Sequence, residues 1–457
     1  MTHPLRCFTA YDIRGKVPDE LNFDIARYVA AAFVKRVGAK KVVVGHDMRL
    51  TSPEFAATLG DALTACGADV IDIGLCGTEE VYHATSAGEG EGVDGGIMVT
   101  ASHNPADYNG MKLVRRGARP LSGDSGLKEI REDVAAMLAA GKVLFEGSGK
   151  KGALNRDFSK DDYVRHLLSY VKKEELKPMK LVVNAGNGCA GPVIDLLERE
   201  LPFEFIKIHH RPDGTLPNGI PNPLLPEKRE ATAKAVREHG ADMGIAWDGD
   251  FDRCFLYDEN GRFIEGYYIV GLLATALLRA NPGATIIHDP RLVWNTREMV
   301  REAGGKPVMS KTGHAFIKER MRVEDAVYGG EMSAHHYFKA FAYCDSGMIP
   351  WLLAAGLISG SGEKLSAMVD ERMAKFPVSG EINSTVKDPD EVIERIKAEY
   401  GGYEEDYTDG LSVTAPKFRF NVRKSNTEPV LRLNVETRGD GALLKELTDN
   451  LLRIIRR

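Results

Sequence analysis

The chain has 457 residues, of which 43% are hydrophobic and 28% are charged, and its formal net charge is −6. This length predicts two to four domains, and the composition excludes a disordered chain. The negative charge argues against an obligate nucleic-acid binder, although a local basic cleft could still hold an anionic substrate. The six cysteines form no CxxC pair, which excludes a zinc site of that kind and a disulfide framework.

The sequence contains no recognisable targeting or membrane segment. The first 14 residues lack the basic-then-apolar order of a secretory signal. The longest nearly apolar run, Tyr267–Leu278, is shorter than the roughly 20 residues that cross a bilayer, and its place after Gly266 suits a buried helix. We therefore expect a cytoplasmic protein.

Short apolar runs that end in Gly or Asp alternate with amphipathic segments up to about residue 365. The expected strands are Lys41–Asp47, Gly96–Thr100, Lys180–Asn184, Met243–Trp247, Thr285–Asp289 and Ala326–Gly329. Helical periodicity follows several of them, at Ser52–Cys66, Pro192–Glu200 and Gly266–Leu278. This alternation predicts parallel sheets with helices on both faces.

The last part of the chain has a different pattern. Three closely spaced strands and then a helix are expected at Leu411–Ala415, Phe418–Lys424, Val430–Glu436 and Ala442–Ile455. This order predicts an antiparallel sheet with helices on one side, and Ser359–Glu363 and Pro377–Gly380 are suitable boundary segments. We predict an α/β protein with three similar α/β domains and a C-terminal α+β domain, at residues 1–149, 150–256, 257–371 and 372–457.

A polar loop, Thr100-Ala101-Ser102-His103-Asn104-Pro105, directly follows an expected strand. Ligands of open α/β sheets bind beyond the carboxyl ends of the strands, where this loop would lie. The ordinary interpretation is an Asn-Pro turn in which Ser102 or Thr100 caps a neighbouring group. The functional interpretation makes Ser102 a nucleophile or phosphate carrier beside His103. No glycine flanks Ser102 in the GxSxG manner, so a hydrolase elbow is excluded.

Three carboxylates at alternate positions, Asp248, Asp250 and Asp252, follow the expected strand Met243–Trp247. Like charges this close repel strongly unless a cation lies among them, which favours a magnesium site over a solvated acidic turn. An EF-hand fails because Arg253 stands at the sixth position, where that loop needs glycine. A phosphorylated Ser102 could supply a further oxygen, and the ion would neutralise the phosphoryl group in transfer.

The segment Arg423–Pro429 links two of the C-terminal strands, and Arg432 lies just beyond it. Alone it would be interpreted as a charged, solvated hairpin loop. Its guanidinium, hydroxyl, amide and backbone N–H groups would also form a cradle for a phosphate dianion. Two smaller polar segments, Lys311–His314 and Asn109–Lys112, complete the set.

Another polar segment, Gly330–His336, follows a further expected strand. Glu331 and Ser333 could form hydrogen bonds to paired sugar hydroxyls. The neighbours His335 and His336 are an alternative pair of metal ligands, but adjacent residues of a strand point to opposite faces.

The segment Gly186–Gly191 matches GxGxxG between a strand and a helix, as a dinucleotide-binding fold requires. Such a fold needs an acidic residue at the end of the next strand. The run Phe203–His210 ends in Lys-Ile-His-His, and Glu204 lies too early. A nicotinamide site is therefore a weaker alternative.

Four of these motifs, TASHNP, DGDFDR, GEMSAHH and RKSNTEP, resemble the α-D-phosphohexomutase family, occur in that family's order and span most of the chain. The similarity is greatest to bacterial phosphomannomutases that supply GDP-mannose for surface polysaccharide, some of which also act on glucose phosphates. The resemblance implies four domains around a central cleft, of which the first three share a mixed α/β topology.

The resemblance also implies roles for particular residues. Ser102 would be the phosphoserine, and its phosphate would complete the Mg²⁺ site of Asp248, Asp250 and Asp252. Tyr11–Gly15 resembles the family's N-terminal motif and would bring Arg14 near Ser102 and His103. Lys112 and His314 match positions that handle protons. The substrate would be bound by Arg253, Glu331, Ser333, His335, Arg423, Ser425, Asn426, Thr427 and Arg432.

Two positions depart from the family pattern. Ala334 stands where a glycine is common before the histidine of the sugar segment, although the nearest relatives also carry alanine. Arg291, in Asp289-Pro290-Arg291, stands where related enzymes have a lysine. Arginine could replace it as a phosphate contact, but the two side chains are not equivalent.

These features support a hypothesis for the reaction. The enzyme would interconvert mannose 6-phosphate and mannose 1-phosphate through phosphorylated Ser102 and a hexose 1,6-bisphosphate, which would also act as activator; phosphoglucomutase or dual activity is the alternative. Lys112 (ordinary pKa ~10.4) would need burial or a cationic neighbour to accept the proton, and His314 (~6.5) needs less help. The C-terminal domain would close over the substrate and exclude water.

The expected partners are small sugar phosphates, without nucleic acid or membrane, and the expected state is a monomer or weak dimer. Three other classes of protein remain to be distinguished by experiment. An oxidoreductase would bind nicotinamide at Gly186–Gly191, a non-catalytic sugar-phosphate binding module would not turn over with magnesium, and a metal-dependent phosphatase would release inorganic phosphate.

Overall fold

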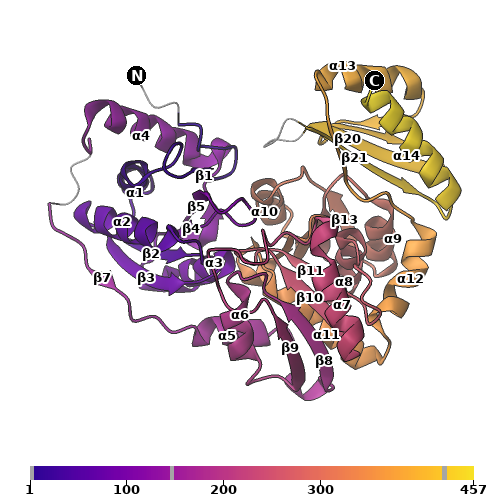
Figure 1. Ribbon diagram of the computed structural model, residues 1–457, viewed down its shortest axis with the longest axis horizontal. Helices are drawn as coiled ribbons and strands as arrows, with labels where there is room; N and C mark the ends of the chain where they lie inside the picture. The colour runs from indigo at the N-terminus through magenta and orange to yellow at the C-terminus, as the bar shows by residue number, and fades with distance from the viewer. Residues whose placement is uncertain (1–4, 145–148, 425–429) are drawn as a thin grey trace. The chain divides into compact units, whose positions relative to one another are not determined.

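The computed structural model describes residues 5–144, 149–424 and 430–457 (Figure 1). The chain forms two compact units. Unit 1 comprises the chain up to Arg262 together with Ala340–Gly360, and unit 2 comprises Phe263–Lys339 and Ser361–Arg457.

The first sheet of unit 1 has the strand order β1-β5-β4-β2-β3-β7, and β6 pairs with β5. Strands β2, β3, β4 and β7 are parallel, whereas β5 is antiparallel to both β4 and β1. Its strands are β1 (Ile13–Lys16), β2 (Lys41–His46), β3 (Asp69–Leu75), β4 (Gly95–Val99), β5 (Tyr108–Arg115), β6 (Arg119–Pro120) and β7 (Leu154–Asn155). Its helices are α1 (Phe23–Val37), α2 (Ser52–Ala65), α3 (Thr78–Ala87) and α4 (Lys128–Ala140).

Alternating side chains of β2 build the two cores of this layer. Val42 and Val44 belong to a cluster with residues of α1, α2 and α4. Val43, between them, belongs to a second cluster with Val81 of α3. Because successive strand residues point to opposite faces, an unbroken valine run buries both faces of the sheet and is covered by helices on each.

The second sheet of unit 1 has the order β11-β10-β8-β9, with β8, β9 and β10 parallel and β11 antiparallel at the edge. Trp351 of α11 packs edge-on against Phe203 and Phe205 of β9, with ring centroids 6.5 and 6.0 Å apart. This packing attaches the late segment 340–360 to unit 1. The elements are β8 (Met179–Asn184), β9 (Phe203–Ile208), β10 (Met243–Trp247), β11 (Cys254–Tyr257), α5 (Asp161–Leu168), α6 (Ala190–Leu197), α7 (Glu230–His239) and α11 (Met348–Ser361). The short strand β16 (Cys344–Asp345) also belongs to the residues of unit 1 but is not part of this sheet.

Unit 2 begins with the third mixed sheet, whose strands within this unit have the order β13-β12-β14-β15. Strands β12, β13 and β14 are parallel, and β15 is antiparallel to β14. Its elements are α8 (Gly266–Ala280), β12 (Thr285–His288), α9 (Trp294–Glu302), β13 (Lys306–Met309), α10 (His314–Val323), β14 (Tyr328–Gly330), β15 (His336–Phe338) and α12 (Leu365–Lys375).

The C-terminal part of unit 2 is an antiparallel sheet in the order β17-β21-β20-β19-β18. Leu431, Leu433 and Val435 alternate along β21 and pack with residues of α13 and α14 in one core, so both helices cover one face. The elements are β17 (Ile382–Thr385), α13 (Pro389–Tyr400), β18 (Glu404–Asp406), β19 (Leu411–Thr414), β20 (Phe418–Lys424), β21 (Val430–Thr437) and α14 (Gly441–Ile455). The predicted α+β domain is confirmed.

The α/β fold is confirmed, and antiparallel strands at one end of each α/β sheet give the mixed topology that the family resemblance implies. Strand β5 is absent from the expected strands, where Asn109–Lys112 appears only as a polar segment. In the structure Gly110 lies inside β5, where a β-carbon would lie 2.3 Å from the Ile13 carbonyl oxygen and 2.7 Å from that of Thr100. Glycine is therefore needed for close approach of strands, not for a turn.

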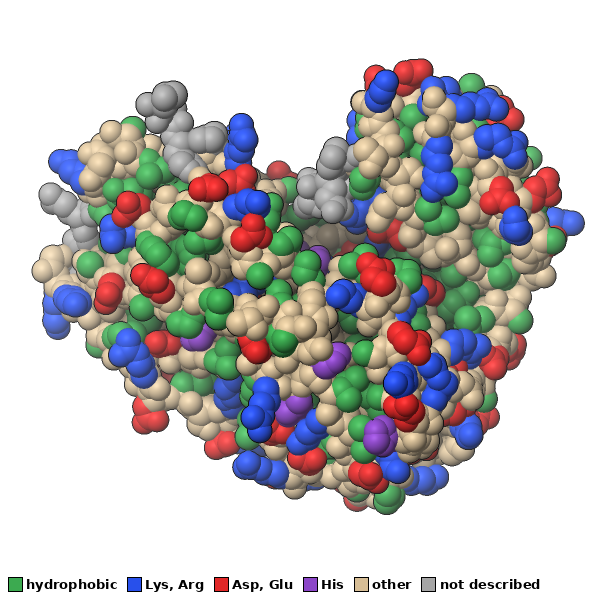
Figure 2. Space-filling model, viewed as in Figure 1, with side chains coloured by type: hydrophobic (Ala, Val, Ile, Leu, Met, Phe, Trp, Pro, Cys, Tyr) green, Lys and Arg blue, Asp and Glu red, His purple; other side chains and the backbone are tan. Residues whose placement is uncertain are grey.

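Two further features concern the surface charge and possible membrane spans. On the face in view, Lys and Arg side chains are interspersed with Asp and Glu side chains (Figure 2). Within the described ranges, the structure contains no helix with the length and apolarity of a membrane span.

Candidate active site

Ser102 lies in the loop after β4, where the sequence analysis expected a nucleophile. Its hydroxyl donates to Asp248 Oδ2 at 2.7 Å, and His103 Nδ1 lies 3.0 Å from Ser102 Oγ. Its backbone has φ +46°, in the left-handed region, which costs about 1–2 kcal/mol for a residue with a side chain. The surrounding structure must hold the loop in this conformation.

Arg49, which the sequence analysis did not single out, supplies that support. Its buried guanidinium donates to the carbonyl oxygens of Ser102 (2.9 Å) and Asn104 (2.6 Å), and also to those of Pro105 and Tyr108. Asp47 Oδ2 lies 3.4 Å from Arg49 Nε and gives this cation a counter-charge. One side chain at the end of β2 therefore fixes the backbone of the whole Ser102 loop.

The three predicted aspartates are brought together after β10. Oxygens of Asp248, Asp250 and Asp252 lie within 4.8 Å of one another, and all three residues are buried. Burial, followed by the charges of Asp252 and Asp250, raises the pKa of Asp248 well above its usual range. Asp250 Oδ1 is buried and accepts no hydrogen bond from the described residues. This all-oxygen donor set with an unsatisfied oxygen fits a hard divalent cation such as Mg²⁺.

The glycine motif 186–191 packs against the aspartate loop. A β-carbon on Gly188 would lie 2.6 Å from the Gly249 carbonyl oxygen, and the Cys189 N–H donates to that oxygen at 2.9 Å. A β-carbon on Gly249 would lie 2.6 Å from the Ser102 carbonyl oxygen. These glycines let three loops approach one another, which accounts for the motif without a dinucleotide.

Lys112 projects from β5 into the aspartate set. Its ammonium group donates to Asp250 Oδ2 at 2.7 Å and to Asp252 Oδ2 at 2.5 Å. Burial lowers its pKa, but the charges of these two aspartates outweigh burial, so the pKa is raised. Thr78 Oγ1 also donates to Asp250 Oδ2, at 2.5 Å. Lys112 is therefore a cation bound to two of the predicted metal ligands.

Arg14, His103 and Arg253 surround Ser102 in unit 1. Arg14 pairs with Asp12 at 2.6 Å and donates to Asn104 Oδ1 at 2.7 Å. Arg253 Nε lies 3.6 Å from Asp248 Oδ2. Burial, and then the charges of Arg253 and Arg14, lower the pKa of His103 well below its usual range, so its imidazole is neutral.

Unit 2 contains a second polar set, centred on Arg291. Its buried guanidinium pairs with Asp289 Oδ2 at 2.8 Å and also approaches Glu331 Oε1 (3.4 Å) and Ser333 Oγ (3.3 Å). His335 Nδ1 lies 3.6 Å from Glu331 Oε2. Arg291 therefore contacts both residues that the sequence analysis assigned to sugar hydroxyls.

The other two histidines of the predicted polar segments, His336 and His314, make different contacts. The His336 side chain is buried, and its Nδ1 lies 2.7 Å from the Tyr328 hydroxyl. His336 therefore has a different partner from His335, which lies beside Glu331. His314 begins α10, directly after Gly313, whose N–H donates to Glu331 Oε1 at 3.0 Å. The backbone at the start of α10 is thus attached to the Glu331 carboxylate.

The predicted phosphate cradle lies at the end of β20 and on β21. Arg423 Nη2 and Arg432 Nη1 approach the carboxylate of Glu381 at 3.3 and 3.4 Å. Arg291 Nη1 approaches the same carboxylate at 3.4 Å. The predicted residues Ser425, Asn426 and Thr427 lie outside the described residues.

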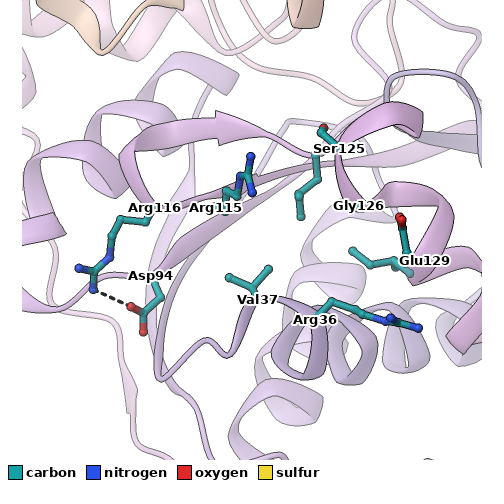
Figure 3. Close-up of a pocket in the computed structure, with 10 residues that line it drawn as sticks. Arg36, Val37, Asp94, Arg115, Arg116, Ser125, Gly126 and Glu129 are labelled. Carbon is teal, nitrogen blue, oxygen red and sulfur yellow. Dashed lines mark hydrogen bonds and ion pairs between the residues drawn. The ribbon is translucent and has the colours of Figure 1, made fainter. Parts of the chain in front are cut away.

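A cavity of about 440 Å³ lies elsewhere in unit 1 (Figure 3). Its lining includes Arg36, Asp94, Arg115 and Glu129, and Arg116 is paired with Asp94 at 2.8 Å. It shares no lining residue with the Ser102 set. The cavity is therefore separate from the Ser102 set.

Comparison with known proteins gives the family. Phosphoglucomutase/phosphomannomutase family models match four successive parts of the chain: alpha/beta/alpha domain I at residues 5–139, domain II at 161–261, domain III at 265–376 and the C-terminal domain at 381–454. The chain is 60% identical over 455 residues to "phosphohexose mutases" of Xanthomonas campestris pv. campestris, and 58% identical over 458 residues to a phosphomannomutase of Salmonella montevideo. Each alignment covers 99% of both chains.

A solved structure is similar over the same length. The phosphoglucomutase/phosphomannomutase family protein of Burkholderia thailandensis superposes with a TM-score of 0.87 at 33% identity, covering 99% of this chain and 97% of that chain. The chain therefore belongs to the phosphoglucomutase/phosphomannomutase family. It is an intramolecular phosphotransferase of the isomerase class, a phosphohexomutase.

Proposed function

We propose that the enzyme interconverts mannose 6-phosphate and mannose 1-phosphate through a phosphoserine at Ser102 and a hexose 1,6-bisphosphate intermediate. The observation that carries this proposal is the Ser102 hydroxyl, 2.7 Å from Asp248 Oδ2 in a set of three buried aspartates. A serine in that position can exchange a phosphoryl group at a place where a bound cation would neutralise the charge of that group. The mannose preference rests on the relatives named phosphomannomutase. Phosphoglucomutase or dual activity is the alternative.

Each residue of unit 1 has a proposed task in this reaction. Asp248, Asp250 and Asp252, with the phosphate on Ser102, would hold Mg²⁺, which when bound would neutralise the charge of the transferring phosphoryl group. His103 contacts the Ser102 oxygen and Arg14 contacts Asn104 of the same loop, so these two keep the loop oriented, while Arg253, beside Asp248, binds the substrate. Arg49 holds the loop itself through its five carbonyl contacts.

The residues of unit 2 bind the substrate in this proposal. Arg423 and Arg432, with Ser425, Asn426 and Thr427, take its existing phosphate, and Glu331, Ser333 and His335 take the ring hydroxyls. Charge-assisted contacts of this kind give both affinity and orientation. Arg291 contacts Glu331 and Ser333 and so positions them.

In the transfer step, the bond between Ser102 Oγ and phosphorus breaks, and a bond forms between phosphorus and the sugar O1 or O6. The proton of that hydroxyl passes to Lys112 or His314, between which the proposal leaves the choice open. Because Asp250 and Asp252 hold Lys112 as a cation, Lys112 would first have to lose its own proton, whereas a neutral His314 could accept the proton directly. The bisphosphate then reorients and returns its other phosphate to Ser102. Free hexose 1,6-bisphosphate acts as activator by restoring the phosphoserine.

The setting of the reaction is part of the proposal. We propose a cytoplasmic monomer or weak dimer that binds sugar phosphates and neither nucleic acid nor membranes, and that supplies GDP-mannose for surface polysaccharide. The proposed domains are residues 1–149, 150–256, 257–371 and 372–457, and the four matched family segments support a division into four.

The experiment is a coupled assay with mannose 1-phosphate and glucose 1-phosphate, with and without hexose 1,6-bisphosphate. The unchanged enzyme is compared with Ser102→Ala and with the control Ser169→Ala, a surface serine of the same unit. We expect Ser102→Ala to lose activity at least ~10³-fold, and mannose 1-phosphate to have the higher kcat/KM. Full turnover by Ser102→Ala would remove the phosphoserine mechanism, and a preference for glucose 1-phosphate would establish the alternative substrate.

A further inference from the structure

Glu381, just before β17, lies among three guanidinium groups of unit 2. Its carboxylate is 3.3 Å from Arg423 Nη2, 3.4 Å from Arg432 Nη1 and 3.4 Å from Arg291 Nη1. Burial raises its pKa, but the charges of the three arginines outweigh burial and lower it, so Glu381 is ionised. No sequence motif singled out this residue.

These contacts are loose compared with a well-formed pair in the same cluster. Arg291 lies 2.8 Å from Asp289, within the range of strong charge-assisted hydrogen bonds. Glu381 is shared among three cations at longer distances. The Nε atoms of Arg291 and Arg423 are also buried, and neither donates to an acceptor within the described part of the chain. The guanidinium groups therefore have donor capacity that one carboxylate does not fill.

Within the described residues, carboxylates already match the positive charges of this cluster without a ligand. Arg291, Arg423 and Arg432 face the carboxylates of Asp289, Glu331 and Glu381, and the charge of Asp409 also acts on Arg423. A phosphate dianion added to a balanced, largely buried cluster would meet uncompensated negative charge. One carboxylate must leave for the phosphate to bind favourably.

Glu381 is the carboxylate that can leave. Its side chain is 22% exposed, whereas those of Asp289 and Glu331 are 3% and 2% exposed. Asp289 is also fixed by the N–H groups of Arg291 and Met332, at 2.9 and 2.8 Å. Among the described residues, the contacts of the Glu381 carboxylate are the three long ones to arginine, and its side chain is partly exposed to water.

We propose that Glu381 is an internal counter-anion that occupies the arginine cluster in the free enzyme and is displaced by the phosphate of the substrate. This inference rests on the proposed function, which assigns Arg423 and Arg432 to that phosphate. The carboxylate keeps three repelling guanidinium groups together before binding. It also competes with the ligand, so it weakens phosphate binding and speeds release of the product.

The test measures binding of inorganic phosphate by calorimetry to the full-length enzyme, the Glu381→Gln variant and the control Glu394→Gln. Glu394 is an exposed glutamate of α13, paired with Lys397 at the surface. We expect Glu381→Gln to lower the Kd for phosphate about tenfold or more, and Glu394→Gln to leave it unchanged. An unchanged or higher Kd in Glu381→Gln would overturn the proposal.

A second variant guards against misfolding. Glu381→Asp keeps the charge but withdraws the carboxylate by one methylene, and we expect a smaller decrease in Kd in the same direction. Thermal unfolding of each variant shows whether unit 2 is intact. If Glu381→Gln does not fold, an unchanged or higher Kd in folded Glu381→Asp overturns the proposal.

Arg423→Gln separates this inference from the proposed function. The gain of affinity in Glu381→Gln must disappear in the double variant with Arg423→Gln, because the gain depends on that guanidinium. If phosphate binding is insensitive to Arg423, the cradle assignment fails and the counter-anion role fails with it. If binding depends on Arg423 but not on Glu381, only the counter-anion role fails.

Discussion

The Ser102 set of unit 1 and the Arg291 set of unit 2 are both buried and charged, but their charges are balanced in opposite ways. In unit 1, the carboxylates of Asp248, Asp250 and Asp252 outnumber the nearest cations, Lys112 and Arg253. In unit 2, three guanidinium groups face three carboxylates, one of them loosely held. Buried charge must be compensated, so the first set needs a cation and the second can exchange its own anion for a ligand.

The two sets also differ in what holds them in place. The Ser102 loop depends on backbone contacts: Arg49 donates to its carbonyl oxygens, and Gly249 allows the aspartate loop to lie against it. The Arg291 set depends on pairs between side chains. We therefore expect abrupt losses from small changes in unit 1 and graded changes in affinity from substitutions in unit 2.

The largest effect is expected for Asp248→Asn. This substitution removes an anionic ligand while it keeps the shape of the side chain, so kcat should fall ~10³-fold and Mg²⁺ binding should weaken strongly. Kinetics and calorimetry with Mg²⁺ measure both effects. Without Mg²⁺ the variant should be at least as stable as the unchanged enzyme, because one of three repelling charges is gone. Asp124→Asn, at an exposed position, is the control; unchanged turnover and unchanged Mg²⁺ binding of Asp248→Asn would contradict the assignment of Asp248 as a ligand of the cation.

A somewhat smaller loss is expected for Gly249→Ala. The added β-carbon would lie 2.6 Å from the Ser102 carbonyl oxygen and must push the two loops apart. We expect kcat to fall about 10²-fold, since a displacement of about 1 Å costs that much in a positioned site. Gly90→Ala is the matched control, because nothing lies within 4 Å of its β-carbon. Equal activity of the two variants would contradict the claim that backbone proximity governs unit 1.

A graded effect on binding is expected for Arg423→Gln in unit 2. Loss of one charged hydrogen-bond donor should raise KM for the hexose phosphate roughly 10–100-fold and change kcat less. Steady-state kinetics with both hexose 1-phosphates separates the two constants. Lys424→Gln, at the exposed neighbouring position, is the control. A fall in kcat with constant KM would place Arg423 in the chemical step.

The smallest effect at neutral pH is expected for His83, buried in unit 1 beside Phe341, with ring centroids 6.2 Å apart. Burial, and then the charge of His166, lower the pKa of His83 to about 4. The unfolded chain therefore binds this proton at a higher pH than the folded one. Stability should fall as pH decreases from about 6.5 to about 4, by about 3 kcal/mol.

His83→Phe keeps an aromatic ring without a titratable nitrogen, so it should remove this part of the acid sensitivity. Denaturant unfolding at pH 7 and pH 4.5 measures the difference. His336 of unit 2, whose pKa burial lowers to about 3, provides a second, independent contribution. Identical pH profiles for the variant and the unchanged enzyme would contradict the first assignment.

From the sequence, the chemically important residues of the two sets could be predicted more completely than the contacts that hold them in place. Ser102, the three aspartates and Arg423 stand in short polar runs directly after apolar runs, so local sequence reveals them. Arg49 also follows an expected strand, Lys41–Asp47, but its role could not be recognised, because its carbonyl partners lie more than 50 residues further along the chain. Long-range partners of this kind are set by the fold and leave no local pattern.

The glycine motif also shows that local sequence alone does not identify the role of a residue. Gly186–Gly191 has the spacing of a dinucleotide motif, but its glycines serve the approach of other loops, including that of Gly249. Glu381 precedes an edge strand in an ordinary polar stretch, and only three guanidinium groups gathered from distant segments give it a role. Spacing along the chain indicates residue type and local geometry, whereas the occupant of a site depends on tertiary contacts.

The most direct test of the account is transfer of phosphate to and from Ser102. Enzyme charged with a labelled hexose 1,6-bisphosphate is digested, and the labelled peptide is sequenced by mass spectrometry before and after addition of unlabelled mannose 6-phosphate. The account predicts one label per chain, on Ser102, which moves to the sugar when substrate is added. Label on another residue, or label on Ser102 that substrate does not remove, would contradict it.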